Sequence, residues 1–520
     1  MQPRPNGMPM FDKSMPFSAA DVRHPSSRLI MVSNRGPVEH SIDNDGQLTR
    51  RGNGGGLATA LASLTPGNPV TWIASAASPA DRMVAAGGQA IQLNGGTRLQ
   101  LITLPPESYD LYYGTFCNPI LWFLQHSLWD RLQRPNLEQE ALHSWQKGYL
   151  PVNQTFAEAV VEELDRGDGP GRVMLHDYHL YAAPLFIRNL RPDTTLQQFI
   201  HIPWPGPEAW QRLPRPIVES ICAGLLANDS VVFQTNGSVR NFLLTCQTFL
   251  SNVRLDHEGT GVWHDGHRTR VWANPVSVDI WDLRSRLSSP EAAAYREKFS
   301  IEGDVQTIVR VDRLDPSKNV AAGFRAYDRL LEQHPEWIGK VRFIALLVPS
   351  RTNIAEYQTY AQEVFAEAEA VNARHGRPDW TPITVIHEHN RLQALVAMSL
   401  YDVLLVNPVV DGMNLVSKEG PVLNSRNGVL VLSSTAGSFA ELQGAALAIH
   451  PEDVDGTAEA LHTALSLPGK ERHERAQRLR EAVLRHDLRR WLQRLVEDFD
   501  RGQNAPERQA GTATARGVRS

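Results

Sequence analysis

Residues 402–419 have the sequence DVLLVNPVVDGMNLVSKE, in which a short apolar run is followed by a polar turn and then by a helical pattern. An apolar run of this length, bounded by turn residues, is typical of a strand buried on both faces of a parallel sheet. The turn after such a strand lies at the carboxyl edge of the sheet, where open α/β sheets bind their ligands. This stretch therefore predicts a strand–helix unit and, beside it, a candidate binding site.

The same apolar pattern recurs along the chain, at 28–33, 70–73, 172–175, 198–202, 230–233, 307–311, 341–348, 383–386 and 428–432. Apolar residues at helical spacing lie between many of these runs, at 155–166, 208–227, 319–334, 354–372 and 455–467. This alternation predicts α/β layers with right-handed crossovers. It pauses at the proline-containing stretch 273–279 and resumes near 306, so we place a domain boundary between 275 and 300.

Composition narrows the class of protein. A chain of 520 residues with 42% hydrophobic residues is expected to form two folded domains. The net charge of −5, without a long basic stripe, argues against nucleic acid as a partner. The three cysteines lack the paired spacing of a zinc site and fit a reducing cytoplasm, and no apolar run is long enough for a membrane span. Residues 1–27 and 502–520 are predicted to be flexible tails.

The motif DGMNLVSKE (411–419) carries the first candidate site. Backbone N–H groups at the start of the helix can bind an anion, and Gly412 allows close approach of the chain. The carboxylate of Asp411 suits sugar hydroxyls better than phosphate, and Glu419 can accept hydrogen bonds from a ribose. The alternative is structural, with Asp411 as a helix cap and Glu419 in a surface ion pair.

The motif RVDRLDPSK (310–318) again follows a predicted strand. Arg313 and Lys318 would place two permanent cations at the carboxyl edge of the second sheet, a fitting pair for a diphosphate leaving group. The alternative is a solvated ion-pair cluster with Asp312 and Asp315.

The first domain has a glycine-rich loop and two polar strand ends that are candidates for the site. The triple glycine that includes Gly55 and Gly56 precedes a predicted helix and can cradle a phosphate or a sugar, or it is a plain loop. Asp177, after the strand at 172–175, can orient an acceptor hydroxyl, and His201 can donate to an oxyanion or a sugar hydroxyl. Both are otherwise buried polar residues with structural partners. No Asp-x-Asp pair lies at a predicted strand end facing the cleft, so we expect no essential metal and no cofactor.

In their order and spacing, HDYHL (176–180), FIHIPWP (199–205), RVDRLDPSK and DGMNLVSKE resemble the retaining nucleotide-sugar glycosyltransferases of the trehalose-6-phosphate synthase family. The resemblance runs from about residue 28 to 490. It implies the GT-B fold, an α/β architecture of two Rossmann-like domains facing across a cleft. By this resemblance, 28–285 form the acceptor domain, 286–480 the nucleotide-sugar domain, and 481–501 a last helix that returns to the N-terminal domain.

The resemblance also implies a reaction, the transfer of glucose with retention from a nucleoside diphosphate-glucose to glucose 6-phosphate, by a front-face mechanism in which the departing phosphate takes the acceptor proton. The partners would be these small molecules, with a homo-oligomer left open. By position, the acceptor contacts are Arg35, Tyr113, Trp122, Asp177 and Arg351. The donor contacts are Gly55, Gly56, Arg313, Lys318, His389, Asp411, Gly412, Met413, Asn414, Leu415, Val416 and Glu419. Catalytic roles fall to Asp177, His201, Arg313, Lys318 and Asp411.

Two positions depart from the family pattern. Ser75 stands where an aromatic residue of the acceptor pocket is usual, and His389 stands where the nucleobase loop often has an aromatic residue. The first leaves the acceptor uncertain, and the second leaves uridine, guanosine and adenosine open as the base. A pseudo-glycosyltransferase of the same family, which joins carbasugars through nitrogen, and a non-catalytic sugar-phosphate sensor are the alternatives. The intact 411–419 motif and the presence of Arg313 and Lys318 favour true sugar transfer.

Overall fold

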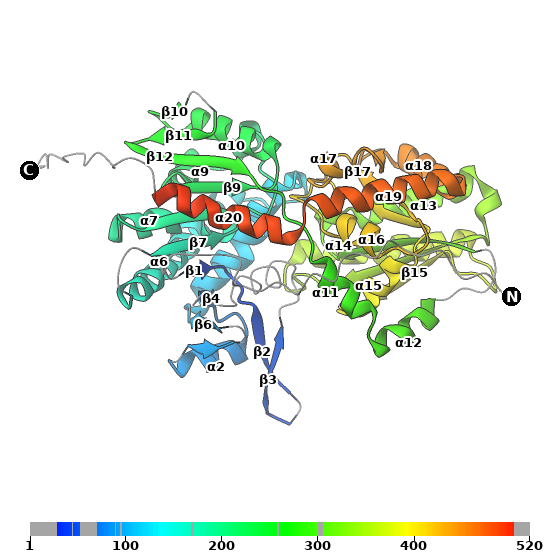
Figure 1. The fold of residues 1–520 in the computed structure, drawn as a ribbon, viewed down its shortest axis with the longest axis horizontal. Coiled ribbons are helices and arrows are strands. Elements are labelled where there is room, and N and C mark those ends of the chain that lie inside the picture. Colours follow the sequence, from blue (N-terminus) through cyan, green and yellow to red (C-terminus); the bar gives the residue numbers. More distant parts are fainter. Residues whose placement is uncertain are drawn as a thin grey trace, which may run out of the picture.

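The computed structural model describes residues 29–503, apart from 44, 53–69, 89, 94–95, 133, 168–170, 257–258 and 300–304. Its elements form two α/β units that lie side by side, each around its own sheet (Figure 1). Gly55 and Gly56, the predicted tail at 1–27 and residues 504–520 of the predicted C-terminal tail lie outside the described residues.

The first sheet is parallel through its centre and antiparallel at both edges, in the order β10-β11-β12-β9-β8-β7-β1-β4-β6-β5. Its strands are β1 (Leu29–Val32), β4 (Val70–Ser75), β5 (Ile91–Gln92), β6 (Thr97–Ile102), β7 (Arg172–His176), β8 (Thr195–Phe199), β9 (Ser230–Phe233), β10 (Arg254–Leu255), β11 (Gly261–His264) and β12 (His267–Ala273). A separate hairpin pairs β2 (Val38–Ile42) with β3 (Leu48–Gly52).

The helices of this unit cover both faces of the sheet. They are α2 (Pro79–Ala86), α3 (Pro106–Tyr109), η3 (Asp110–Leu121), α4 (Trp122–Gln125), η4 (Trp129–Arg131), α5 (Leu137–Ser144), η5 (Trp145–Tyr149), α6 (Leu150–Asp165), η6 (Tyr178–Leu180), α7 (Ala183–Leu190), α8 (Pro207–Trp210), α9 (Arg215–Leu225) and α10 (Asn236–Phe249). Along β7, Val173 and Leu175 join one hydrophobic cluster and Met174 joins the other, because successive side chains point to opposite faces.

The second sheet is wholly parallel, in the order β15-β14-β13-β16-β17-β18. Its strands are β13 (Gln306–Arg313), β14 (Val341–Val348), β15 (Ile383–His387), β16 (Val403–Val406), β17 (Val429–Ser433) and β18 (Leu447–Ile449). Its helices are α11 (Ile280–Leu287), α12 (Pro290–Phe299), η7 (Pro316–Lys318), α13 (Val320–Gln333), η8 (Pro335–Trp337), α14 (Ala355–His375), α15 (Arg391–Ser399), α16 (Val416–Leu423), α17 (Phe439–Leu442), α18 (Val454–Ser466) and α19 (Gly469–Arg485).

The last helix, α20 (Leu488–Gln503), lies against the first sheet (Figure 1). Trp491 packs in the cluster that contains Phe199 of β8, and Gln197 of the same strand donates to the carboxylate of Asp498 at 2.8 Å. The last described helix therefore packs on the first unit.

Three sequence-based expectations need adjustment. The single helix expected at 208–227 is two helices, α8 and α9, because Pro214 interrupts the segment and stands at the N-terminal cap of α9. The strand expected at 198–202 ends at Phe199, so His201 lies beyond it. β5, β6, β10, β11, β12 and β18 were not predicted.

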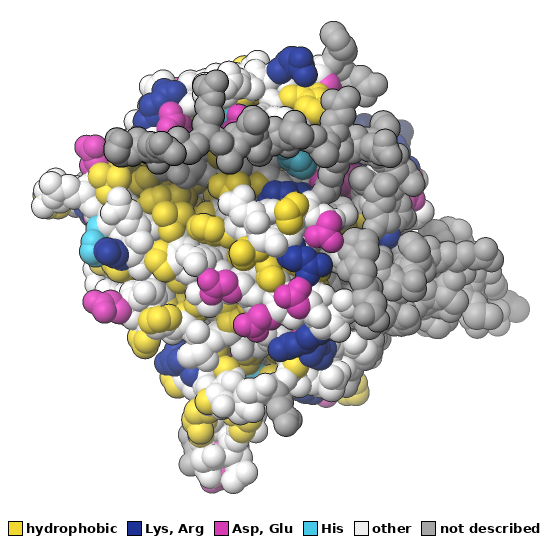
Figure 2. Space-filling model, turned by 90° about the vertical axis from the view of Figure 1, so that its left-hand side faces the viewer, with side chains coloured by type: hydrophobic (Ala, Val, Ile, Leu, Met, Phe, Trp, Pro, Cys, Tyr) yellow, Lys and Arg dark blue, Asp and Glu magenta, His cyan; other side chains and the backbone are white. Residues whose placement is uncertain are grey.

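The surface at the far end of the first unit is mixed. On the face in Figure 2, Lys and Arg side chains lie among Asp and Glu side chains, with hydrophobic side chains between them. Among the described residues, no helix combines the length and the apolar character that crossing a membrane requires.

Candidate active site

The two units meet where the carboxyl ends of their strands face each other. Gly412, after β16, lies so close to the backbone of His201 that a Cβ atom there would overlap with the His201 carbonyl oxygen. Met413 is buried in the same hydrophobic cluster as Phe199 and Trp491. Trp122 of the first unit donates its indole N–H to Asp315 Oδ1 of the second at 3.2 Å.

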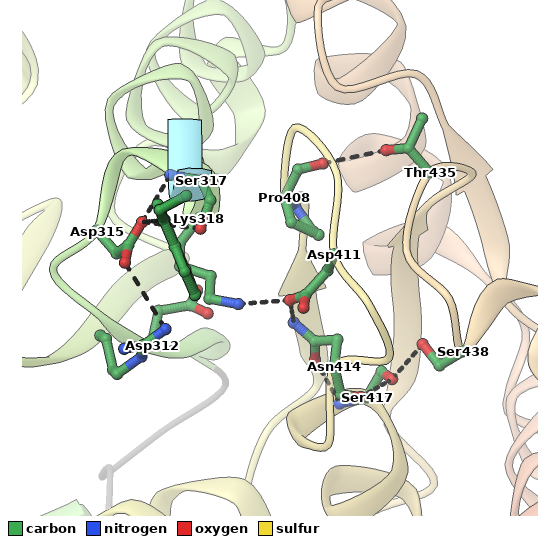
Figure 3. Close-up of polar contacts among 12 residues, drawn as sticks. Asp312, Asp315, Ser317, Lys318, Pro408, Asp411, Asn414, Ser417, Thr435 and Ser438 are labelled. Atoms are coloured by element: carbon green, nitrogen blue, oxygen red, sulfur yellow. Dashed lines mark hydrogen bonds and ion pairs between the residues drawn. The ribbon is translucent and has the colours of Figure 1, made fainter. Parts of the chain in front are cut away.

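In the second unit, the turn after β13 faces the turn after β16 (Figure 3). Lys318 Nζ lies 2.5 Å from Asp411 Oδ2, and Asn414 Nδ2 donates to the same oxygen at 3.1 Å. Burial opposes the ionisation of Asp411, but Lys318 outweighs it and lowers the pKa of the carboxyl group. Asp411 is therefore a partly buried, ionised acceptor rather than the helix cap of the structural alternative.

Asn414 fixes the shape of the second turn. It has a left-handed backbone (φ 75°), and its side-chain oxygen accepts the N–H of Ser417 at 3.1 Å, at the start of α16. Asparagine is among the few residues that adopt this conformation readily. The same side chain thus begins the helix and orients Asp411.

A buried arginine supports the turn that carries Lys318. Arg310 is 0% exposed. Its Nε–H donates a hydrogen bond to Asp312 at 2.9 Å, and its Nη2–H donates one to the main-chain carbonyl of Lys318. Burial raises the pKa of Asp312 to about 6, although Arg310 and Lys318 act in the opposite direction. The solvated cluster of the alternative interpretation is therefore wrong for Asp312, which is buried with Arg310.

Arg313 and Arg351 lie over the ring of Trp122, with guanidinium carbons 5.2 Å and 4.1 Å from its centroid. Arg351 pairs with Asp315 at 2.8 Å and donates to Tyr178 of the first unit at 3.2 Å. Burial raises the pKa of Asp315, but the neighbouring cations, led by Arg313, outweigh it and hold this pKa below its usual value. Arg313 is 43% exposed, and its Nη2 lies 3.7 Å from Asp315 Oδ2, which is longer than the 2.8 Å pair of Arg351 with the same carboxylate. Of these cations, Arg313 is therefore the most accessible to a ligand.

On the first unit, Arg35 follows β1 and donates to the hydroxyl of Tyr113 at 3.4 Å. The positive charge of Arg351 also acts on this hydroxyl. Burial raises the pKa of Tyr113, and the positive charges of Arg35 and Arg351 more than reverse that effect. Two guanidinium groups, one from each unit, therefore converge on one point, which is a geometry suited to a phosphate.

Asp177 follows β7 with a left-handed backbone (φ 70°), which is uncommon for a residue other than glycine. Its Oδ1 accepts the N–H of His201 at 3.2 Å. Burial raises the pKa of Asp177 to about 7, against backbone hydrogen bonds from His201 and Tyr178. This carboxyl group changes its protonation state near neutral pH.

The tautomer of His201 follows from its neighbours. Gln234 accepts the N–H of Val276 through Oε1 at 2.9 Å, so its Nε2 donates to His201 Nδ1 at 3.4 Å. The proton of His201 is then on Nε2, which lies 3.2 Å from His176 Nδ1. Burial lowers the pKa of both imidazoles, which are neutral near pH 7. A donor role toward a substrate requires His201 Nε2 to exchange His176 for that substrate.

The expected nucleoside side of the site lies at α15 and α16. Glu419 is buried and accepts two hydrogen bonds from Arg391, at 3.0 Å and 2.5 Å. The alternative of a surface ion pair is thus wrong, because the pair is bidentate and its carboxylate is buried. Leu415 and Val416 pack partly against the core, and His389 lies two residues before α15.

Among the described residues, only His334, Glu336 and His462 bring three metal-ligand groups together. The two imidazole rings stack at 3.6 Å with 9° between their planes. A ring nitrogen binds a metal in the plane of its ring, so two stacked parallel rings cannot both direct lone pairs at one ion. This group does not fit a metal centre.

Sequence reasoning missed several residues of the site. Arg310 stands inside a strand, Tyr178 lies between two polar motif residues, and Arg391 begins a helix far from Glu419 in sequence. The adjacency of Arg391 to the departure at His389 was the one available signal. No periodic pattern marks the other two.

Comparison with known proteins shows a match to one family over most of the chain. The model of glycosyltransferase family 20 matches residues 27–501. A bifunctional trehalose-6-phosphate synthase/phosphatase of Thermoproteus tenax is 34% identical over 480 residues, which are 89% of this chain, and this chain spans 62% of that relative's length. The UDP-forming alpha,alpha-trehalose-phosphate synthase of Schizosaccharomyces pombe is 33% identical over 491 residues, 92% of this chain and 91% of the relative.

Solved structures of related proteins have the same fold as this chain. A structure of the E. coli trehalose-6-phosphate protein bound with UDP-2-fluoro glucose is similar with a TM-score of 0.78 and 27% identity, covering 91% of this chain and 99% of its own. The UDP-forming synthase of Burkholderia xenovorans in complex with glucose-6-phosphate has a TM-score of 0.76 and 29% identity, covering 91% and 100%. The predicted GT-B fold is thereby confirmed.

Proposed function

The chain belongs to glycosyltransferase family 20, and we propose that it transfers glucose with retention from a nucleoside diphosphate-glucose to glucose 6-phosphate, forming trehalose 6-phosphate. That the chain is a glycosyltransferase follows from the family. The donor and the acceptor are the proposed part. UDP-glucose is the first candidate donor, because the S. pombe relative is UDP-forming and the E. coli neighbour is bound with UDP-2-fluoro glucose.

The observation that carries the proposal is the presence of cations at two positions of the site, one at Tyr113 and one at Asp411. Arg35 and Arg351 converge on Tyr113, whereas Lys318 points to Asp411 at the turn after β16. Arg313 and Arg351 both lie over the ring of Trp122. One position would bind the acceptor phosphate and the other the donor diphosphate, so that two phosphorylated substrates meet between the units.

In the proposed reaction, the bond from the anomeric carbon to the diphosphate breaks, and a bond to the acceptor hydroxyl oxygen forms on the same face. Arg313 and Lys318 stabilise the charge that grows on the departing phosphate, which is a contact stronger in the transition state than in the ground state. The carboxylate of Asp411 accepts a hydrogen bond from a hydroxyl group of the transferred glucose. Asp177 orients the acceptor hydroxyl.

The proton of the acceptor hydroxyl passes to the departing phosphate oxygen. The carboxylates nearest to Lys318 support this route, because each already has a cationic partner: Asp411 has Lys318, Asp315 has Arg351 and Asp312 has Arg310. A carboxylate held in an ion pair is a poor nucleophile for a covalent intermediate. We propose that no metal ion is required, since Arg and Lys supply the positive charge.

The test uses the purified chain with glucose 6-phosphate and UDP-, GDP- or ADP-glucose, each in excess EDTA. We expect release of nucleoside diphosphate and a non-reducing disaccharide phosphate whose NMR couplings show two anomeric centres, both in the α configuration. A reaction without acceptor controls for hydrolysis of the donor. No release with any of the three donors would reject the synthase, and activity that returns only with a divalent cation would reject the metal-free route.

A further inference from the structure

Gln234, which follows β9, connects the imidazole of His201 to the linker between the two units, residues 274–279 between β12 and α11. The backbone N–H of Val276 in this linker donates to Gln234 Oε1 at 2.9 Å. Gln234 Nε2 lies 3.4 Å from His201 Nδ1. Gln234 is 2% exposed and Val276 is 6% exposed, so the contact between them is buried.

The linker is held at this point by a side chain from each unit. The carbonyl of Val276 accepts a hydrogen bond from Lys418 Nζ of α16 at 2.8 Å. Lys418 is 0% exposed and pairs with Glu441 at 2.9 Å. Val276 is therefore fixed through its carbonyl by the second unit and through its N–H by Gln234 of the first.

The backbone N–H of Val276 fixes the orientation of the Gln234 amide, because a backbone N–H can only donate. The amide oxygen faces Val276, so the amide nitrogen faces His201. His201 Nδ1 then accepts a hydrogen bond, and the proton of the neutral ring is on Nε2. The reversed tautomer would direct two N–H donors at each other. Turning the amide to relieve this would leave the buried N–H of Val276 without an acceptor, which is unfavourable.

The other neighbour of the His201 ring does not determine the tautomer. His201 Nε2 lies 3.2 Å from His176 Nδ1, and burial lowers the pKa of both imidazoles, so the two facing nitrogens share one proton. His176 is 1% exposed, and its Nε2 has no hydrogen-bond partner among the described residues. Nothing beyond His176 therefore directs its Nδ1 to donate rather than to accept. The position of the proton is determined by Gln234.

His201 is the member of this chain of contacts that can reach a ligand. It is partly exposed, whereas His176 and Gln234 are buried. A Cβ atom at Gly412 would overlap with the His201 carbonyl oxygen, so His201 lies beside the turn that carries Asp411. That turn is the position proposed for the transferred glucose. A neutral imidazole with its proton on Nε2 can donate to a hydroxyl oxygen of that sugar.

We propose that Gln234 is a positioning residue, which is held by the Val276 peptide and keeps the proton of His201 on Nε2, so that His201 donates a hydrogen bond to a hydroxyl of the transferred glucose in place of His176. The proposal rests on the proposed function. Gln234 acts through His201 and needs no contact with either substrate.

Gln234→Glu tests the tautomer through the pH dependence of kcat. An ionised carboxylate can accept from Val276 but cannot donate to His201, so it draws the ring proton to Nδ1 and leaves Nε2 bare. At lower pH, one further proton shared by the carboxyl group and Nδ1 restores the N–H on Nε2. The kcat of Q234E, divided by that of the wild type at the same pH, should therefore fall about 10-fold between about pH 6 and about pH 9.

Division by the wild-type value removes the titration of the other groups that lie against His201. These are His176, which faces its Nε2, and Asp177, whose Oδ1 accepts its backbone N–H at 3.2 Å. Gln125→Glu is the matched control, because Gln125 is 0% exposed and its side-chain oxygen accepts from the hydroxyl of Tyr181 at 2.9 Å rather than facing an imidazole. Its kcat ratio to the wild type should not change with pH. A constant ratio for Q234E, or an equal fall in both variants, would overturn the proposal.

A second measurement uses Gln234 as it stands and does not depend on the folding of Q234E. In the full chain with isotope-labelled histidine, the ring nitrogen signals of His201 are those that disappear in His201→Gln, and their NMR shifts distinguish a protonated from an unprotonated nitrogen. We expect a protonated Nε2 and an unprotonated Nδ1 at neutral pH. The reverse would overturn the proposal. A wild type that is inactive with glucose 6-phosphate and all three donors would instead reject the proposed function, and the tautomer distinguishes the two failures.

Discussion

The two sides of the site differ in the charge of the groups that face the substrates. The second unit presents charges that are already paired: Lys318 with Asp411, Arg351 with Asp315, and Arg391 with Glu419. The first unit presents mostly neutral groups, including the imidazoles of His176 and His201, whose pKa values burial lowers.

The difference indicates how each side can respond to a ligand. A buried cation that has a carboxylate partner is stable without a ligand, and it can transfer part of its interaction to a phosphate when one binds. A neutral group held by hydrogen bonds has no charge to exchange, so it contributes fixed geometry. We infer that the cations of the second unit stabilise the negative charge that grows on the departing phosphate, while the first unit holds the acceptor in place.

The largest effect is expected on the charged side. Arg313→Ala should lower kcat by about 100-fold or more, the scale of losing one charge contact to a transition state. The matched control is Arg325→Ala, because Arg325 is equally exposed, 42% against 43%, and pairs with Glu363 and Glu367 on the surface. Steady-state kinetics with saturating substrates measure both. A nearly unchanged kcat for Arg313→Ala would exclude this role.

On the neutral side, Asp177 is the group that titrates. Its pKa of about 7, raised by burial, predicts that kcat/KM for the acceptor rises about 10-fold between pH 6 and pH 8 as the carboxylate forms. Asp177→Asn should lose activity and this rise. The folded chain also keeps this proton where the unfolded chain has released it, so the free energy of unfolding should fall as pH rises from about 4 to about 7. A pH profile in Asp177→Asn identical to that of the wild type would contradict the assignment.

Much of the fold could be predicted because buried parallel strands leave a local signal. The apolar run at 403–406 and the polar turn after it coincide with β16 and the loop that carries Asp411. The same rule placed Asp177 after β7 and Lys318 after β13. β6 was missed because its sequence, TRLQLI, alternates apolar with polar residues and lacks a continuous apolar run.

The partners of these residues could not be predicted, because they come from elements distant in sequence. Arg391 meets Glu419 across two helices, and Trp122 meets Asp315 across the two units. Whether a charged residue is exposed or buried is decided by such contacts. For that reason the alternatives of a surface ion pair for Glu419 and a solvated cluster for Asp312 could not be excluded before the structure.

A smaller effect is expected from disturbing Arg310, which holds the turn that carries Lys318. In Gly323→Ala, the new Cβ would overlap with Arg310 Nη1, and Arg310 holds the carbonyl of Lys318. Displacing Arg310 should raise KM for the donor by about 5-fold, since overpacking costs on the order of 1 kcal/mol or more. Gly469→Ala is the control, because nothing lies within 4 Å of a Cβ at that helical position. Equal KM values for the donor in the two variants would show that Arg310 does not support donor binding through Lys318.

The smallest effect tests the arginine that joins the two sides. Tyr357 accepts a hydrogen bond from Arg351 Nη1 at 2.5 Å and lies 3.4 Å from Asp315 Oδ2. Tyr357→Phe removes one of the contacts that hold this guanidinium, so KM for glucose 6-phosphate should rise about 3-fold, the value of one hydrogen bond.

Tyr360→Phe is the control for this change, because Tyr360 is equally buried on the same helix and its hydroxyl accepts the backbone N–H of Val320 at 2.6 Å. Both variants should unfold at similarly lower temperatures, and only Tyr357→Phe should change KM for the acceptor. If Tyr357→Phe instead raises KM for the donor alone, Arg351 belongs to the charged side that binds the diphosphate, and the acceptor phosphate depends on Arg35 without a guanidinium from the second unit.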